Sequence, residues 1–286
     1  GAPNCPLQHR HEWRKLGSMR PPMPLVVFSD LDGTLLDHDT YDWAPACPAL
    51  ERLKSFGIPL VLASSKTEAE IRQVQADMGL AGAAAIVENG AGMIGVPSSE
   101  CTKSRDYRTL RQCLNVVPSA LRAKFKGFGD MSTRDVAQAT GLTFEAAQSA
   151  KMRTFSEPGV WSGSLSDRER FLAALARHGV SARMGGRFLT ISFGGTKQDR
   201  MSDIMKHHRA RASVALGDAP NDVEMLAHAD YGFIIANPHH PPLPRVAGEA
   251  EGRIMRTDLP GPHGWNAAIN GFLDRFDWTT ERHQSG

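Results

Sequence analysis

Two carboxylates separated by one residue follow directly after a short apolar run. The run PLVVFS is rich in β-branched and aromatic residues, and Asp30-Leu31-Asp32-Gly33-Thr34 comes next. Such a run predicts a buried parallel strand, and in open α/β sheets ligands bind at the carboxyl ends of the strands. Two carboxylates there can divide a reaction between them, Asp30 as nucleophile and Asp32 as general acid and base. A solvated turn or a site that only holds a metal would use the same pair.

A second acidic segment, Gly217-Asp218-Ala219-Pro220-Asn221-Asp222, follows another apolar run, ASVAL. This placement again puts carboxylates at the carboxyl end of a predicted strand. Two acidic clusters at one sheet edge would repel each other unless a cation lies between them, and hard oxygen ligands favour Mg²⁺. The alternative for Asp222 is that it only caps the helix that starts near Asn221.

Two basic segments could bind the anion that such carboxylates attack. Ser64-Ser65-Lys66 lies between a predicted strand and a helix that Thr67 would cap, and hydroxyls beside a helix N-terminus form a phosphate site. Lys197 opens a later helix in the segment GGTKQD. Taken singly, each has a plainer interpretation, because strand-to-helix turns favour Ser and Thr and most lysines are solvated.

Three further groups carry possible roles. Glu88 and Asn89 end a predicted strand at the site, so Glu88 could orient substrate hydroxyls, although Asn89-Gly90 is also a common turn. Arg187 and Phe188 lie in a predicted hairpin, where the arginine could hold a carboxylate or simply be solvated. Five histidines have a spacing that fits no common zinc site, so we expect solvated or helix-face side chains there: His38, His207, His208, His239 and His240.

The elements that must position these residues alternate between strand and helix. Residues 48–57 and 67–79 predict helices, and residues 58–65 and 83–89 predict strands. This alternation predicts a doubly wound parallel sheet with helices on both faces, an α/β fold. After about residue 96 the pattern becomes mixed, with a hairpin around Gly185-Gly186, and the alternation returns near residue 195. We therefore expect a catalytic core from residues 24–96 and 193–286, an inserted α+β domain at 97–192, and a tag or disordered leader at 1–23.

Composition limits the classes of protein that fit. The 286 residues are 41% hydrophobic, and 33 basic against 31 acidic residues give a net charge of +2. So balanced a charge argues against nucleic acid or an anionic membrane as the main partner. No run reaches the ~18 apolar residues of a membrane span, and the N-terminus has no signal-peptide pattern. Four cysteines without metal-site spacing predict reduced thiols in a cytoplasmic protein: Cys5, Cys47, Cys101 and Cys113.

The four segments DLDGT, SSKT, TKQD and GDAPND together resemble the haloacid dehalogenase-like hydrolase superfamily. Its motifs run, in this order, from DxDGT after the first strand to a Ser or Thr after the second, a Lys and then GDxxND. An insertion between the second and third motifs resembles a C2-type cap on a Rossmann-like core. The segments TLLDHDTYDWAPA, IVENGA, GFGDMS, FSEP and GRF, with SSK in place of Thr-Gly-Arg, are similar to the mannosyl-3-phosphoglycerate phosphatases. This resemblance covers residues 24–236, with departures mainly in the cap.

The resemblance implies a Mg²⁺-dependent phosphomonoesterase that works through an aspartyl-phosphate. The implied substrate is a phosphorylated sugar-glycerate, mannosyl-3-phosphoglycerate. We expect the protein to be a monomer or a weak dimer. A glucosyl-3-phosphoglycerate phosphatase, another sugar phosphatase, a phosphomutase and a non-catalytic sensor are the alternatives. The implied roles are catalysis by Asp30 and Asp32; phosphate binding by Ser64, Ser65, Lys197 and Asn221; metal binding by Asp30, Asp32, Asp218 and Asp222; and substrate binding by Lys66, Glu88, Asn89, Arg187 and Phe188.

Overall fold

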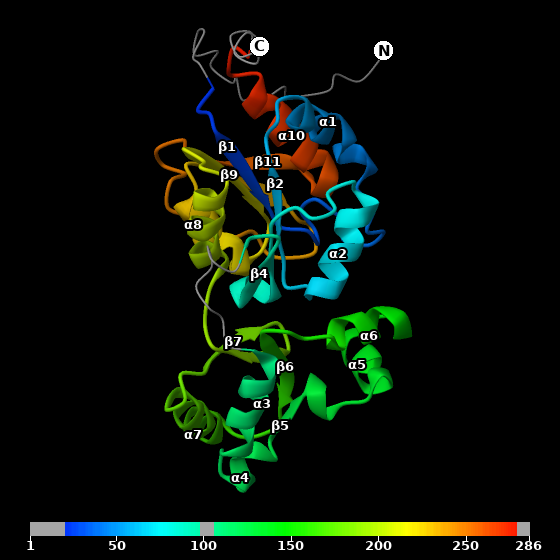
Figure 1. Ribbon diagram of the computed structural model, residues 1–286, viewed down its shortest axis with the longest axis vertical. Helices are drawn as coiled ribbons and strands as arrows, with labels where there is room; N and C mark the ends of the chain where they lie inside the picture. Colours follow the sequence, from blue (N-terminus) through cyan, green and yellow to red (C-terminus); the bar gives the residue numbers. More distant parts are fainter. Residues whose placement is uncertain (1–20, 98–105, 279–286) are drawn as a thin grey trace, which may run out of the picture.

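The computed structural model describes residues 21–97 and 106–278, and within them the strands form two sheets (Figure 1). The larger sheet has the order β11-β10-β9-β1-β2-β3-β4, and the smaller has the order β5-β6-β8-β7. Residues 1–20 of the expected leader, Cys5 and Cys101 lie outside the described residues. Among the described helices, none combines the length and the apolar character needed to cross a membrane.

The larger sheet is parallel except at one edge. Its central strand β1 (Leu25–Ser29) pairs in parallel with β2 (Leu60–Ala63) and β9 (Ala212–Gly217). Because these three strands run in the same direction, the loops that follow them meet at one edge. The remaining strands are β10 (Tyr231–Ala236), β11 (Ile254–Pro260), β3 (Ala85–Val87) and the antiparallel edge strand β4 (Gly92–Ile94).

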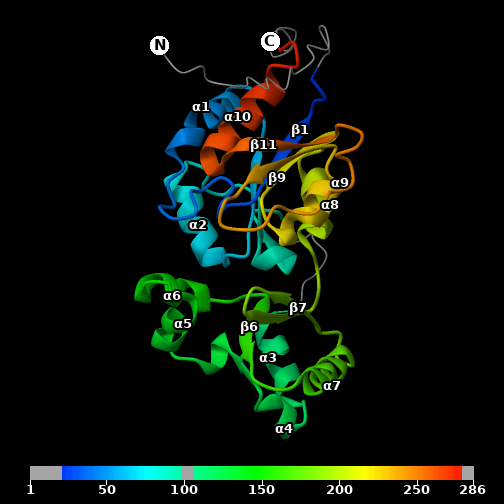
Figure 2. The ribbon, with the colours of Figure 1, turned by 180° about the vertical axis from the view of Figure 1, so that it is seen from behind.

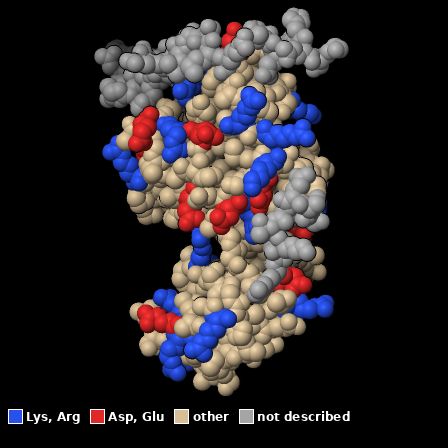
Figure 3. Space-filling view, turned by 60° about the vertical axis from the view of Figure 1, so that its left-hand side comes forward, with Lys and Arg blue, Asp and Glu red and all other residues tan. Residues whose placement is uncertain are grey.

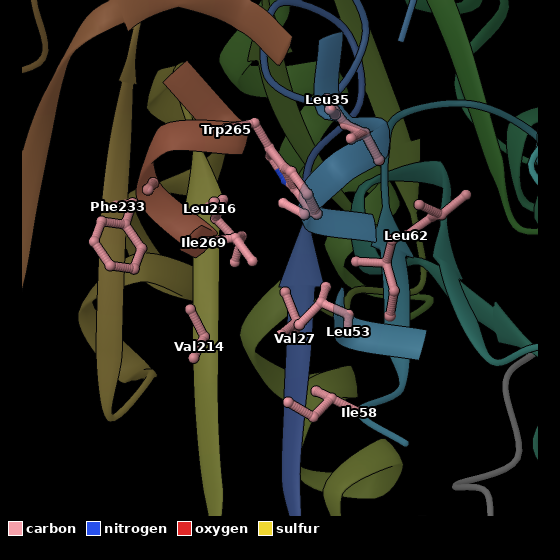
Figure 4. Close-up of a cluster of buried hydrophobic side chains, with 14 of the residues drawn as sticks. Val27, Leu35, Leu53, Ile58, Leu62, Val214, Leu216, Phe233, Trp265 and Ile269 are labelled. Atoms are coloured by element: carbon pink, nitrogen blue, oxygen red, sulfur yellow. The ribbon is translucent and has the colours of Figure 1, made fainter. Parts of the chain in front are cut away.

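Alternate residues of β1 face two separate apolar clusters, which explains why the whole strand is apolar. Leu25 and Val27 pack on one side with Leu53 and Trp265, as Figure 4 shows for Val27 and its neighbours, whereas Val26 and Phe28 pack on the other. The first face is covered by α1 (Cys47–Ser55), α2 (Glu68–Asp77) and α10 (Gly261–Leu273), and the second by α8 (Lys197–His207) and α9 (Val223–His228). This is the doubly wound α/β fold expected from the sequence.

The elements between β4 and α8 build the smaller sheet, and we call them the cap. Its antiparallel strands are β5 (Phe125–Gly127), β6 (Ser156–Trp161), β7 (Ser181–Gly185) and β8 (Phe188–Ser192). The predicted hairpin is confirmed, since Gly185 pairs with Phe188. Its helices are α3 (Tyr107–Asn115), α4 (Ser119–Arg122), α5 (Thr133–Thr140), α6 (Phe144–Lys151) and α7 (Leu165–Ala176). The cap stands against the end of the core at which β1, β2 and β9 finish (Figures 1 and 2).

Two helices that carry candidate residues begin with strong capping interactions. The Thr67 hydroxyl accepts from the backbone N–H of Glu70, whose carboxylate accepts from the Thr67 N–H, so the predicted capping box of α2 is confirmed. Thr196 and Asp199 form the same arrangement at the start of α8. The two boxes fix the backbone beside Lys66 and Lys197.

Candidate active site

A buried lysine lies between two buried carboxylates at the carboxyl edge of the large sheet. The Lys197 Nζ donates to Asp30 Oδ1 at 2.8 Å and to Asp222 Oδ1 at 2.6 Å. Burial raises the pKa of Asp30, repulsion from Asp222 raises it further, and Lys197 offsets only part of this. Burial opposes the charge of Lys197, but the attraction of Asp222 and Asp30 outweighs burial and raises its pKa. Lys197 therefore stays protonated and bonds one oxygen of Asp30.

Asp218 is held by two residues to which the sequence analysis gave no role. Thr34 Oγ1 donates to Asp218 Oδ1 at 2.5 Å, and Asn237 Nδ2 donates to Asp218 Oδ2 at 2.7 Å. Burial raises the pKa of Asp218, while these two hydrogen bonds act in the opposite direction. Thr34 belongs to the DxDGT segment after β1, and Asn237 follows β10. Both are polar residues just after a parallel strand, and that position in the sequence could have indicated that they lie at the site.

Gly33 makes this arrangement possible. Its φ of +79° lies in the left-handed region, and a Cβ there would stand 2.6 Å from Asn237 Nδ2 and 2.9 Å from Asp218 Oδ2. A side chain at this position would displace the group that orients Asp218. The glycine is therefore required by space as well as by backbone conformation.

Three carboxylates form a site whose chemistry fits a divalent cation. Asp30, Asp218 and Asp222 are buried and offer oxygens within 4.8 Å of one another. When all three are ionised, their negative charges face one lysine, so a hard cation such as Mg²⁺ would complete the charge balance. Both oxygens of Asp222 are already engaged, Oδ1 by Lys197 and Oδ2 by the backbone N–H groups of Asp218 and Ala219. Asp222 is also fully buried, whereas Asp30 and Asp218 keep 7% and 5% of their surface exposed, so the carboxylates of Asp30 and Asp218 are better placed to hold the ion.

The Asp32 carboxylate lies apart from that trio, although it was predicted as a metal ligand. Its Oδ2 is 3.0 Å from Lys66 Nζ, and its Oδ1 is buried without a hydrogen-bond partner among the described residues. Ser64 is buried, and its hydroxyl accepts from the Lys66 backbone N–H at 3.2 Å, whereas Ser65 is exposed. The loops after β1 and β2 thus place Asp32, Lys66 and the two serines at one edge, beside the N-terminus of α2.

The structure corrects the prediction for Glu88. Its carboxylate accepts from the backbone N–H groups of Thr154, Phe155 and Ser156 at 2.9–3.1 Å and from the Ser156 hydroxyl at 2.9 Å. Arg153 Nε forms an ion pair with it at 2.9 Å. These cap residues occupy the acceptors that would have bound substrate hydroxyls. Glu88 therefore connects core to cap.

The other predicted residues differ in how the structure places them. Asn89 is exposed, and its Oδ1 accepts from Asn221 Nδ2 at 3.0 Å, so the loops after β3 and β9 bring these two amides together. Arg187 is exposed at the turn of the β7–β8 hairpin, with its guanidinium carbon 5.8 Å from the centre of the Phe188 ring. The hairpin reaches the core nearby, because Arg183 Nη1 lies 3.7 Å from Glu224 Oε2. Asp and Glu side chains are exposed on the surface of the core, next to the narrow region between core and cap (Figure 3).

The histidines are only partly as expected. His207 is the last residue of α8, as expected for a helix-face side chain, and His208 is its C-cap, whose Nε2 is buried without a hydrogen-bond partner in the part of the chain that the structure describes. The rings of His38 and His239, however, stack with centroids 4.0 Å apart, and His240 meets His38 edge-on at 5.9 Å. The loops after β1 and β10 bring these residues together, and that proximity is invisible to an analysis of spacing along the chain.

Comparisons with known proteins agree with this geometry. The sequence model of a haloacid dehalogenase-like hydrolase family matches residues 27–112 and 173–242. A glucosyl-3-phosphoglycerate/mannosyl-3-phosphoglycerate phosphatase of Persephonella marina is 31% identical over 278 residues, covering 88% of this chain and 98% of that protein. Two solved structures share the fold. The haloacid dehalogenase subclass IIB sugar phosphatase BT4131 has a TM-score of 0.57 at 18% identity, covering 87% of this chain and 99% of its own. The sucrose-phosphatase of Synechocystis sp. PCC6803 has a TM-score of 0.55 at 15% identity, covering 89% and 99%.

Proposed function

Because the chain belongs to the haloacid dehalogenase-like hydrolase family, we propose that it is a Mg²⁺-dependent phosphatase that hydrolyses mannosyl-3-phosphoglycerate to mannosylglycerate and phosphate. The observation that carries the reaction class is the buried Lys197 between Asp30 and Asp222, with Asp218 beside them. The support for the substrate is the relative of 31% identity and its printed name. The glucosyl analogue is the alternative substrate.

Asp30 is the nucleophile in this proposal. Lys197 engages Asp30 Oδ1, which leaves Oδ2 to form a bond to phosphorus while the bond from phosphorus to the substrate oxygen breaks. Asp32 gives its proton to the leaving oxygen, and then takes a proton from the water that attacks the aspartyl-phosphate. That second attack breaks the bond between phosphorus and Oδ2, so phosphate leaves and the Asp30 carboxylate is restored.

The remaining residues bind and orient the phosphate. Lys197, Asn221 and the Ser64-Ser65 loop at the N-terminus of α2 face its negative oxygens. Asp30 and Asp218 would hold the Mg²⁺, and Thr34 and Asn237 orient the Asp218 carboxylate for this role. When bound, the ion would supply positive charge that offsets the charge of these carboxylates and of the phosphate dianion. The cap, which we place at residues 97–192, covers the organic part of the substrate and excludes water.

A substrate panel tests the assignment. Phosphate release should be measured with Mg²⁺ on mannosyl-3-phosphoglycerate, glucosyl-3-phosphoglycerate and mannose 6-phosphate. A site built to pair the glycerate carboxylate, with Lys66 or Arg187, leaves a cation unpaired on a hexose phosphate. We expect the better glycosyl-3-phosphoglycerate to exceed mannose 6-phosphate in kcat/KM by about 100-fold. Equal values would contradict the substrate class and leave the phosphatase activity standing.

A further inference from the structure

Tyr41 has a backbone conformation that large side chains rarely adopt. Its φ is +58°, in the left-handed region. Glycine and asparagine tolerate this region, but the bulky side chain of a tyrosine disfavours it. Such strain persists only where the surroundings impose it, and it concentrates at functional sites. The residue is also 51% exposed, so burial of the ring does not explain the strain.

The loop around Tyr41 is built to hold this conformation. Asp37 Oδ1 accepts from the backbone N–H groups of Asp39 and Thr40 and from the Thr40 hydroxyl, at 2.9–3.0 Å. The Tyr41 N–H donates to the Asp37 carbonyl at 3.0 Å, and the Asp37 N–H donates to the Asp42 carbonyl at 2.9 Å. The His38 ring, stacked on His239, fixes the loop from the β10 side. The strained residue is therefore held in one place.

That place is the edge of the candidate active site. The Tyr41 ring centre lies 5.5 Å from Lys66 Nζ, which lies 3.0 Å from Asp32 Oδ2. Lys66 has little exposed surface, and Asp32 Oδ1 has no hydrogen-bond partner among residues 21–97 and 106–278. Tyr41, Lys66 and Asp32 thus form a row that leads from the exposed surface to the residue that would protonate the leaving group.

We propose that Tyr41 determines specificity by stacking its ring against the sugar of the substrate. The C–H face of a pyranose carries slight positive charge and is apolar, so it matches the negative face of an aromatic ring. In the proposed reaction the leaving group begins beside Asp32, and Tyr41 is the exposed aromatic residue at the other end of the row that starts there. The inference rests on the proposed function, and it assigns part of sugar recognition to a core loop in addition to the cap.

Three variants separate the ring from the strain. Tyr41→Gly removes the ring and relieves the strain, Tyr41→Asn removes the ring but keeps a side chain that tolerates this φ, and Tyr41→Phe keeps the aromatic face. Kinetics should be measured on mannosyl-3-phosphoglycerate and on 3-phosphoglycerate, which has the phosphate and the carboxylate but no sugar. Melting temperatures should be measured in parallel, and we expect that of Tyr41→Gly to equal or exceed the wild-type value.

We expect Tyr41→Gly and Tyr41→Asn to raise KM for the glycosyl substrate about tenfold with a smaller effect on kcat. Their KM for 3-phosphoglycerate should stay within about twofold, and Tyr41→Phe should resemble wild type on both substrates. An unchanged KM for the glycosyl substrate, or equal losses on the two substrates, would overturn the proposal. If the wild type cleaves hexose phosphates but no glycosyl-3-phosphoglycerate, the proposed substrate fails by itself. Mannose 6-phosphate and glycerol 3-phosphate then make the same comparison for Tyr41.

Discussion

At the scale of single residues, the site is a small group of charged side chains that lie close together and are buried. Asp30, Asp218 and Asp222 are buried together with one buried lysine. Lys197 bonds one oxygen of Asp30 and one of Asp222, and the backbone after β9 takes the other oxygen of Asp222. The burial of these charges is costly, because each ion loses its hydration. Lys197 is the counter-ion that the protein itself supplies to these carboxylates. In the proposed function, Mg²⁺ is the second one.

The nucleophile gives the first prediction. Asp30→Asn keeps the size and the contact with Lys197 but removes the carboxylate that would bond phosphorus. We expect kcat for phosphate release to fall by at least about three decades, with little change in the melting temperature. Asp77→Asn, an exposed change at the end of α2, serves as the control and should retain full activity. If Asp30→Asn kept a tenth of the wild-type turnover, the aspartyl-phosphate mechanism would be wrong.

At the scale of elements, the turn η2 (Glu88–Gly90) connects several loops of the site. All three of its residues have positive φ. The backbone N–H groups of Glu88 and Asn89 donate to the carbonyls of Lys66 and Ser64, and Arg200 Nε donates to the carbonyl of Gly90. The Glu88 carboxylate binds the segment that enters β6 of the cap. One short turn therefore links the loop after β2, helix α8 and the cap.

Glu88→Gln tests this link. The amide keeps the shape, but Arg153, whose side chain is 6% exposed, loses its charged partner. Removal of one member of a buried pair typically costs about 3–5 kcal/mol. Ser156→Ala removes two hydrogen bonds, one to Glu88 and one from Arg153, and should cost about 2 kcal/mol. Urea denaturation measures both. A Glu88→Met/Arg153→Met double variant should recover part of the loss, and a Glu88→Gln loss no greater than that of Ser156→Ala would show that the pair contributes little.

At the scale of the whole molecule, core and cap meet where the carboxylates gather, so binding of an ion there should stabilise the fold. For Mg²⁺ at about 100 times its dissociation constant the gain is about 2.7 kcal/mol, or roughly 5 °C in melting temperature for a chain of this size. EDTA should abolish activity, and Mg²⁺ should restore it. Asp218→Ala should remove most of the thermal increment. Full activity in metal-free buffer, or equal melting temperatures with and without Mg²⁺, would contradict this prediction.

The rise in melting temperature that Mg²⁺ produces should depend on pH. Burial raises the pKa of Asp30 and of Asp218 above 3.8, so the folded, metal-free protein retains protons that the unfolded chain releases as the pH rises above that value. Its stability therefore decreases as the pH rises from 3.8 through the raised pKa values. Mg²⁺ competes with those protons. We expect the Mg²⁺-induced rise in melting temperature to be larger near pH 7.5 than near pH 5, and scanning calorimetry at both values checks it.

Much of the fold could be predicted from the sequence, because its signals are local. Apolar runs followed by polar turns indicated β1, β2 and β9, and the Thr67–Glu70 spacing indicated the start of α2. Parallel strands end at a common edge, so the meeting of Asp30 and Asp218 followed from the order of the strands, whereas only the resemblance to a known family indicated that Lys197 would join them. The capping and strand patterns depend on residues close in the chain, and the sequence shows them directly.

The tertiary structure decided the pairings between distant residues. Glu88 meets Arg153, Asn237 meets Asp218, and His38 meets His239. Each pairing depends on sheet order, loop path and the position of the cap, and no periodicity in the chain encodes these. The φ of Tyr41 likewise follows from hydrogen bonds that close its loop. The sequence by itself therefore determined the strands, and it predicted which residues at their ends would react. Only the three-dimensional arrangement decided which neighbours orient those residues, because such contacts form between segments far apart in the chain.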